Sequence, residues 1–170
     1  MPKIIENLEE KLLCEARKQL QETGYSAMTI RSVAAGCGVG VGTVYNYFPS
    51  KDALLAASML EDWQSCVAAV HGVSGSEQSP ERVLRCIYDQ LLGFIDRHQV
   101  LFRDKSAAAS FAGSFTRYHS VLRDQLAQPL LRFCPDAFTS EFIAEALLTW
   151  TVAGKDFREI SQVIMKILAN

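Results

Sequence analysis

The chain has 170 residues, a length that suits one ordinary domain or a small module joined to a slightly larger one. Hydrophobic residues make up 49% and charged residues 21%, which excludes an intrinsically disordered chain. The formal net charge of −2 does not by itself indicate a nucleic-acid partner. The apolar runs are too short to span a bilayer and no secretory signal is evident, so we expect no membrane association.

The five cysteines are widely spaced, with no C-x-x-C pair and no neighbouring histidine: Cys14, Cys37, Cys66, Cys86 and Cys134. This pattern argues against a disulfide scaffold or a zinc site and is typical of a reducing cytoplasm. We expect no metal and no cofactor, and a cytoplasmic location. Each cysteine is interpreted as a small buried hydrophobe, with thiol sensing as the alternative.

The hydrophobic pattern is helical from the beginning of the chain. Apolar residues recur at every fourth position of the first segment: Ile4, Leu8, Leu12, Ala16 and Leu20. This spacing predicts an amphipathic helix, which Gly24 ends. Thr29 is a favourable N-cap for a short second helix that ends at Gly38. A third short helix is expected over about residues 41–47, before Pro49.

The next helices are longer. A fourth helix is expected to run from Lys51 towards Val70, and the Gly- and Ser-rich segment 71–79 predicts a loop. Pro80 is suited to the first position of a fifth helix. Gly113 is expected to separate two further helical pieces, and Pro129 to kink or end the second one.

The last two helices are predicted over residues 139–152 and 156–168, with Gly154 between them. Asp156 and Glu159 are spaced as a capping box. No strand pattern and no internal repeat is present in the sequence. We therefore predict an all-α fold of about eight to nine helices.

Residues 29–51 combine the features of a helix-turn-helix that reads DNA. Such a motif needs a tight turn between two helices, the second of which enters the major groove. Glycine suits the turn because it accepts a positive φ, and small residues early in the second helix let its backbone approach the bases. Thr29 offers a hydroxyl and free backbone N–H groups to a phosphate, and Lys51 offers a positive charge.

Residues 12–55 resemble the N-terminal domain of the TetR family of bacterial one-component repressors. The most specific match is Gly42-Thr43-Val44-Tyr45-Asn46-Tyr47-Phe48-Pro49-Ser50-Lys51-Asp52. Further matches are Ala16, Leu20, Gly24, Tyr25, Met28-Thr29-Ile30, Val33-Ala34 and Gly38-Val39. The resemblance implies a three-helix DNA-binding domain over residues 1–52, followed over residues 53–170 by a helical domain for effector binding and dimerisation.

The resemblance also implies which residues contact DNA. They are Thr29, Arg31, Val41, Gly42, Thr43, Tyr45, Asn46, Tyr47 and Lys51. Within this set, Arg31 is expected to reach a base. The residues expected to bind phosphates are Thr29, Tyr47 and Lys51, and those expected to face the groove or its walls are Val41, Thr43, Tyr45 and Asn46. Val44 and Phe48 are expected in the core. The alternative for the two tyrosines is that they are core aromatics of a small bundle.

Two features depart from the family pattern. Gly40 stands where the family commonly has a serine that caps the recognition helix, and the first helix is acidic at its start. Glycine is an acceptable N-cap, although one phosphate contact is then missing. These departures favour an operator affinity that is modest or that depends strongly on salt. The acidic first helix also supports the alternative function, a helical ligand-binding or adaptor protein that has lost operator binding.

The segment 142–153 is apolar on nearly all sides, so as a helix it must be covered on both faces. We expect a second subunit to supply the cover, as the resemblance also implies, in a two-fold dimer whose interface is a four-helix bundle. The expected interface residues are Phe142, Ile143, Ala146, Leu147, Trp150, Ile160, Ile164 and Ile167. Such a dimer would place two heads on a palindromic operator.

The resemblance implies a repressor that a small, largely apolar effector releases from DNA. Residues suited to its pocket are Trp63, Cys66, Tyr88, Phe94, Phe111, Phe115, Tyr118, His119 and Trp150. The alternative for each is a place in the core. An all-α enzyme is the remaining class, but the three histidines lie far apart and no catalytic or phosphate-loop pattern occurs. We expect no catalytic residue.

Overall fold

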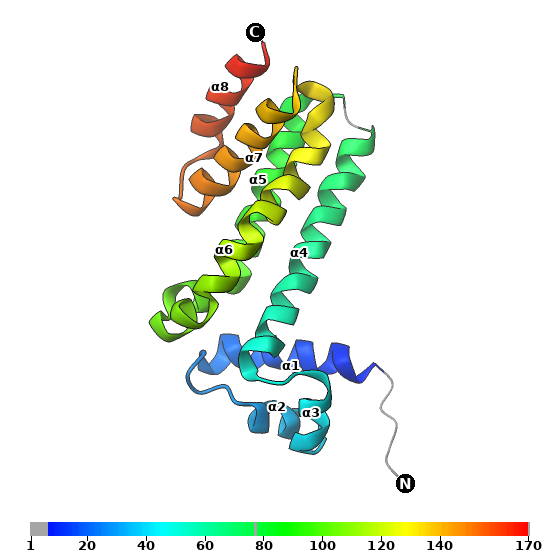
Figure 1. Ribbon diagram of the computed structural model, residues 1–170, viewed down its shortest axis with the longest axis vertical. Coiled ribbons are helices and arrows are strands. Elements are labelled where there is room, and N and C mark those ends of the chain that lie inside the picture. The colour runs from blue at the N-terminus through cyan, green and yellow to red at the C-terminus, as the bar shows by residue number, and fades with distance from the viewer. Residues whose placement is uncertain (1–6, 77, 170) are drawn as a thin grey trace. The chain divides into compact units, whose positions relative to one another are not determined.

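The computed structural model describes the backbone of residues 7–76 and 78–169, and their side chains except at 108 and 112–118. Ile4 of the predicted first helix lies outside these ranges. Within them the chain is helical and contains no strand, which confirms the all-α prediction (Figure 1). The helices are α1 (Leu8–Thr23), α2 (Ile30–Gly36), α3 (Val41–Tyr47), α4 (Lys51–Ser76), α5 (Pro80–Arg103), α6 (Lys105–Ala127), the 3₁₀ helix η1 (Gln128–Phe133), α7 (Ala137–Val152) and α8 (Phe157–Leu168).

The chain divides into two compact units. The first comprises Met1–Asp62 and His98–Ala112, and the second comprises Trp63–Arg97 and Gly113–Asn170. Helices α4, α5 and α6 each contribute residues to both units. The functional boundary expected after residue 52 stays a prediction, because the compact first unit also includes the first part of α4.

In the first unit, α2 packs against both α1 and α3 (Figure 1). Burial explains why apolar residues recur at every fourth position of α1, because Leu12 and Ala16 are fully buried while Lys11 and Lys18 are exposed. Each large apolar side chain that is fully buried in this way contributes about 1.5–3 kcal/mol to folding. Hereafter we call α1, α2 and α3 the head.

The start of α2 and the turn between α2 and α3 have the capping and glycine residues that the sequence predicted. The Thr29 Oγ1 accepts the backbone N–H of Ser32 at 3.0 Å, and the Ser32 hydroxyl accepts the N–H of Thr29 at 3.0 Å. This reciprocal capping box begins α2 where the sequence predicted. Gly38 has a φ of 67°, which allows the chain to reverse before α3.

Two sequence predictions about the middle of the chain are wrong. Helix α4 continues to Ser76, so residues 71–76 are not a loop. Val70 and Ser74 lie one turn apart and are both buried, and packing on this face outweighs the cost of about 1 kcal/mol for each helical glycine. Helix α6 likewise runs through Gly113 without interruption. It ends at Ala127, directly before the segment that contains Pro129, as predicted.

In the second unit, α7 packs against η1 and α8 (Figure 1). Asp136 caps α7 by accepting the backbone N–H of Thr139 at 2.7 Å. The predicted capping box of Asp156 and Glu159 begins α8. Gly154, with a φ of 76°, separates the two helices as expected.

Candidate nucleic-acid interface

Helix α3 is short and its two faces differ sharply. Val44 is completely buried and Phe48, four residues later, is 5% exposed, so both anchor the head as predicted. The opposite side presents Tyr45, Asn46 and Tyr47 to solvent. A seven-residue helix with one anchored side and one polar, aromatic side has the form required of a recognition helix.

The two tyrosines are not core aromatics. Tyr45 is 52% exposed and Tyr47 is 46% exposed, although large aromatic rings in small domains are usually covered. The alternative that both rings pack inside the head is therefore wrong. Each ring leaves its apolar face and its hydroxyl accessible to a partner.

The start of α3 is open and unobstructed. Gly40 is its N-cap and makes no side-chain cap, as its lack of a side chain requires. A Cβ atom built at Gly42 would meet nothing within 4 Å, and Val41 and Thr43 beside it are partly buried. The backbone at Gly42 is therefore free of side-chain cover on its outer side, which suits close approach to a surface.

Thr29 and Arg31 lie at the start of α2, and both are exposed. The Thr29 Oγ1 already accepts the backbone N–H of Ser32 and lies 3.2 Å from the Ser32 Oγ. The Thr29 side chain therefore caps α2. The proposed phosphate contact of Thr29 and the base contact of Arg31 stay predictions.

Lys51 connects the start of α4 with the beginning of the loop after α1. Its ammonium donates to the carbonyl oxygen of Tyr25 at 2.8 Å and lies 3.8 Å from the centre of the Tyr25 ring. The Tyr25 hydroxyl in turn donates to Asp52 Oδ1 at 2.6 Å. Burial, followed by the hydrogen bond to Asp52, raises the pKa of Tyr25 above its ordinary value. Lys51 thus joins α4 to the loop between α1 and α2, and it is also partly exposed to solvent.

The residues predicted to line an effector pocket are divided between the two units. Trp63, Cys66, Tyr88 and Phe94 are buried in the second unit, whereas Phe111 is buried in the first. The side chains of Phe115 and Tyr118 lie outside the described residues. His119 and Trp150 are exposed, and the imidazole of His119 lies 3.5 Å from Glu145 Oε1.

The buried members of this set are engaged in packing. The Trp63 indole donates to Gln125 Oε1 at 2.7 Å, and its ring meets Phe94 edge-on with centroids 5.5 Å apart. The Tyr88 hydroxyl donates to the carbonyl oxygen of Lys155 at 2.9 Å. The Cys66 sulfur accepts from the Arg97 guanidinium at 3.3 Å. These contacts fit the alternative that they are core residues.

A surface hollow of about 400 Å³ lies elsewhere in the second unit. It is lined by Val73, Arg82, Arg85, Cys86, Asp89 and Gln90. The Arg85 guanidinium is already held 3.9 Å above the Phe157 ring and 3.9 Å from Asp89 Oδ1. Burial, and then the nearby Asp89, raises the pKa of the Cys86 thiol. None of the predicted pocket residues lines this hollow.

The predicted dimer residues fall into two groups. Ile143, Leu147, Ile160 and Ile164 are buried within the chain itself, so they support the α7–α8 pair from inside. Ala146 and Ile167 are partly buried, and Phe142 and Trp150 are exposed. An inward-facing side chain has no surface left for a second subunit, so the accessible face differs from the predicted set.

The list of expected interface residues leaves out three exposed apolar residues of these two helices. Phe138 is 74% exposed, Val152 is 69% exposed and Val163 on α8 is 59% exposed. With Phe142 and Trp150, these residues are the accessible large apolar side chains of α7 and α8, and we call them the α7–α8 face. The i, i+4 spacing of Phe138 and Phe142 was the signal that could have found the first of them.

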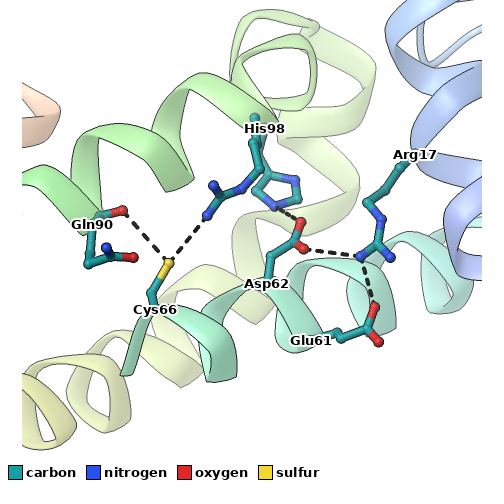
Figure 2. A network of polar contacts seen from close by, with 7 residues as sticks. Arg17, Glu61, Asp62, Cys66, Gln90 and His98 are labelled. Atoms are coloured by element: carbon teal, nitrogen blue, oxygen red, sulfur yellow. Dashed lines mark hydrogen bonds and ion pairs between the residues drawn. The ribbon is translucent and has the colours of Figure 1, made fainter. Parts of the chain in front are cut away.

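A polar cluster in the first unit was also missed. The Arg17 Nη1 on α1 donates to Glu61 Oε2 at 2.8 Å and to Asp62 Oδ1 at 3.0 Å, both on α4 (Figure 2). The other Asp62 oxygen lies 2.9 Å from His98 Nε2 on α5 (Figure 2). His98 is 2% exposed. His98 interrupts an otherwise apolar face between Phe94 and Leu101, which is the sequence signal that could have found the cluster.

Within the described ranges, no group of three or more His, Cys, Asp or Glu side chains is arranged to hold a metal ion. In the same ranges no helix has the length and apolarity needed to cross a membrane.

The chain is similar to known regulators. Residues 12–58 match the family described as "Bacterial regulatory proteins, tetR family". The HTH-type transcriptional regulator UidR of Escherichia coli K12 is 31% identical over 58 residues, which cover 34% of this chain and 30% of UidR. The HTH-type transcriptional repressor KstR of Rhodococcus jostii is 30% identical over 141 residues, which cover 71% of this chain and 64% of KstR. The match thus spans less than two thirds of either relative.

The fold is also that of solved regulators. The transcriptional repressor FadR of Thermus thermophilus, solved with lauroyl-CoA, superimposes with a TM-score of 0.63. The superposition covers 95% of this chain and 93% of FadR at 19% sequence identity. At that identity the likeness concerns the fold, and it extends beyond the head to the helices that follow.

Proposed function

We propose that the chain is a regulator of the TetR family, whose model matches residues 12–58, and that it is a ligand-responsive repressor that binds a palindromic operator as a dimer. It acts in the cytoplasm and has no catalytic role. The observation that carries the proposal is α3: Tyr45, Asn46 and Tyr47 face solvent while Val44 and Phe48 anchor the helix. A side chain reaches a base edge only from such an anchored, outward-facing position.

The proposed DNA contacts follow from this exposure. Gly42 and Thr43 bring the backbone of α3 close to the bases, and Tyr45 and Asn46 contact the groove. Tyr47 and Lys51 bind the phosphates on either side, with Thr29 and Arg31 adding contacts from α2. The two remaining donors of the Lys51 ammonium suit a phosphate, since one donor is used by Tyr25.

The proposed dimer uses the α7–α8 face. Phe138, Phe142 and Trp150 together expose a large apolar area that a soluble chain ordinarily covers. A two-fold dimer through this face buries it on both subunits and presents two heads to a palindrome.

The proposed effector is a small, largely apolar molecule that binds in the second unit. The Thermus FadR of the same fold was solved with lauroyl-CoA, which supports a ligand-binding role for the helices after the head. An effector releases DNA only if it binds the non-operator conformation more tightly, and its effect cannot exceed that difference in affinity.

A band-shift titration with the DNA that flanks the gene of this protein tests the proposal. We expect saturable binding at low salt for the native chain. Tyr47→Ala should weaken it at least about tenfold, because one aromatic or phosphate contact is worth about 1–3 kcal/mol. Leu92→Ala is the matched control, since Leu92 is similarly exposed but lies on α5 in the second unit. Absence of sequence-dependent binding would favour the adaptor alternative.

A further inference from the structure

The Asp62 carboxylate contacts two side chains that come from different helices. Its Oδ1 accepts Arg17 of α1 at 3.0 Å, and its Oδ2 lies 2.9 Å from the Nε2 of His98 on α5 (Figure 2). Asp62 itself belongs to α4. One carboxylate therefore joins α1, α4 and α5 within the first unit.

Burial makes these contacts strong and specific. The side chain of His98 is 3% exposed and that of Asp62 is 16% exposed, so water competes little for either. Arg17 is 27% exposed and is also held by Glu61 at 2.8 Å. Charge-assisted hydrogen bonds of this kind fix direction as well as distance, because the guanidinium donates along set axes. The arrangement is thus suited to holding one helix in a defined orientation on another.

We propose that Arg17, Asp62 and His98 form a clamp that sets the orientation of α1, and with it the head, on α4. Arg17 is the only one of the three on the head. Helices α4 and α5 both continue along the chain into the second unit. Because Asp62 belongs to α4 and His98 to α5, a displacement of either helix moves one of these two residues. The three residues are therefore positioning residues for operator binding and do not contact DNA.

The clamp differs from the ion pair of Arg85 and Asp89, which lies within the second unit. Arg85 lies 3.9 Å from Asp89 on the same helix, with both side chains more than half exposed. Such an i, i+4 pair on one helix contributes little and orients nothing. It provides a matched control, because Arg85→Ala removes the same charged group as Arg17→Ala without touching the first unit.

Amide hydrogen exchange of the free, full-length protein tests the clamp without DNA. In Arg17→Ala and in Asp62→Asn we expect the amides of α1 to exchange on the order of tenfold faster, which corresponds to the net worth of a charged hydrogen bond. The amides of α8 should stay unchanged in these two variants, and the amides of α1 should stay unchanged in Arg85→Ala, whose side chain contacts only the second unit. Equal acceleration in α1 and α8 would indicate general destabilisation and overturn the proposal, as would unchanged exchange in α1.

The consequence for DNA is measured with palindromes whose half-sites are moved one base pair closer or farther apart. This step rests on the proposed function. For the native chain we expect one preferred half-site spacing. For Arg17→Ala and Asp62→Asn we expect the ratio of the affinity at the preferred spacing to the affinity at a shifted spacing to fall towards one. A uniform loss at all spacings would contradict orientation by the clamp. If the native chain binds no operator, the proposed function fails while the exchange experiment still decides the clamp.

His98→Gln provides a second variant in case Asp62→Asn does not fold, since glutamine retains a donor near Asp62 but fills the site less well. We expect its α1 amides to exchange faster than native and more slowly than those of Arg17→Ala. Far-ultraviolet circular dichroism of each variant must match the native spectrum. Native exchange in a folded His98→Gln would remove His98 from the clamp.

Discussion

Lys51 shows how one side chain serves the fold and the proposed DNA contact together. Its ammonium donates to the Tyr25 carbonyl at 2.8 Å and lies over the Tyr25 ring. Removal of the charge therefore affects both stability and binding. The two effects differ in their response to salt, because only a phosphate contact releases counterions from DNA.

We predict that Lys51→Gln reduces the steepness of log K against log salt by about 0.9 for each head. The same variant should lose about 1 kcal/mol of unfolding free energy through the Tyr25 hydrogen bond. Operator titrations at several salt concentrations measure the first effect and urea unfolding the second. Lys155→Gln, at an exposed lysine in the second unit, is the control. A native slope in Lys51→Gln would assign Lys51 to the fold alone.

The sequence predicted the burial of single side chains only where they belong to a specific motif. The match from Gly42 to Lys51 predicted the buried Val44 and Phe48 correctly. It could not show that Lys51 is held by Tyr25, because that contact joins residues 26 positions apart. Tyr88 was assigned to a pocket for its aromatic ring, yet its hydroxyl is bound to Lys155. Aromatic side chains serve cores and pockets alike, so sequence does not separate the two.

At the scale of helices, capping residues made the most reliable predictions. Thr29, Asp156 and Glu159 form the expected bonds because caps depend on neighbours within four residues. The glycines at 72, 75 and 113 led to wrong predictions of helix ends. At Gly72 and Gly75 the reason is burial of the face that carries Val70 and Ser74, a tertiary effect that outweighs a local preference. Local chemistry therefore predicted where helices begin better than where they continue.

The cap of α2 supports a first prediction at this scale. Thr29→Ala removes the acceptor of the Ser32 N–H and should cost about 1 kcal/mol of unfolding free energy. Thr29→Ser keeps the hydroxyl and should lie within a few tenths of a kcal/mol of native. Urea unfolding of the two variants measures both values. Equal stability of the alanine and serine variants would show that the capping bond contributes nothing.

The cap of α7 gives a pH-dependent prediction. The backbone N–H of Thr139 donates to Asp136, and this bond lowers the pKa of the Asp136 carboxyl below its ordinary value. A lowered pKa in the fold means that the stabilisation is present above the ordinary value of about 3.9 and is lost as the pH falls through the lowered one. Asp136→Asn keeps an uncharged acceptor that does not titrate in this range.

We therefore expect the stability of native protein relative to Asp136→Asn to decrease between about pH 6 and about pH 2. Thermal unfolding of both proteins across this range measures the difference. The ordinary pKa of an exposed carboxyl would produce a constant difference instead. The relative stability should not depend on pH above about pH 6, where the carboxyl is ionised in both states.

At the scale of the whole molecule, the α7–α8 face carries the prediction of assembly. Phe142 is half exposed, and a buried aromatic anchor at an interface is worth about 2 kcal/mol or more. Phe142→Glu should raise the dimer dissociation constant at least about thirtyfold, as measured by sedimentation. Val121→Glu introduces the same charge at an exposed apolar residue of α6 and should leave the dimer intact. Equal effects of the two would place the interface elsewhere.

Loss of the dimer should also weaken operator binding, because a single head contacts only one half-site. The sequence predicted a dimer through the last two helices but not which side of them is accessible. Apolar residues surround α7 on nearly all sides, so periodicity alone could not separate those that face α8 and η1 from those that face outward. Packing partners decide that question, and they come from distant parts of the chain.

The two tryptophans lie in different environments, so intrinsic tryptophan fluorescence can report on dimer dissociation. Trp63 is 3% exposed and its indole is hydrogen-bonded to Gln125, whereas Trp150 is 49% exposed on the α7–α8 face. Indole emission shifts to shorter wavelength when the ring leaves water. Dilution of the unlabelled protein should therefore move the emission maximum through Trp150 alone, with the fixed signal of Trp63 as an internal standard.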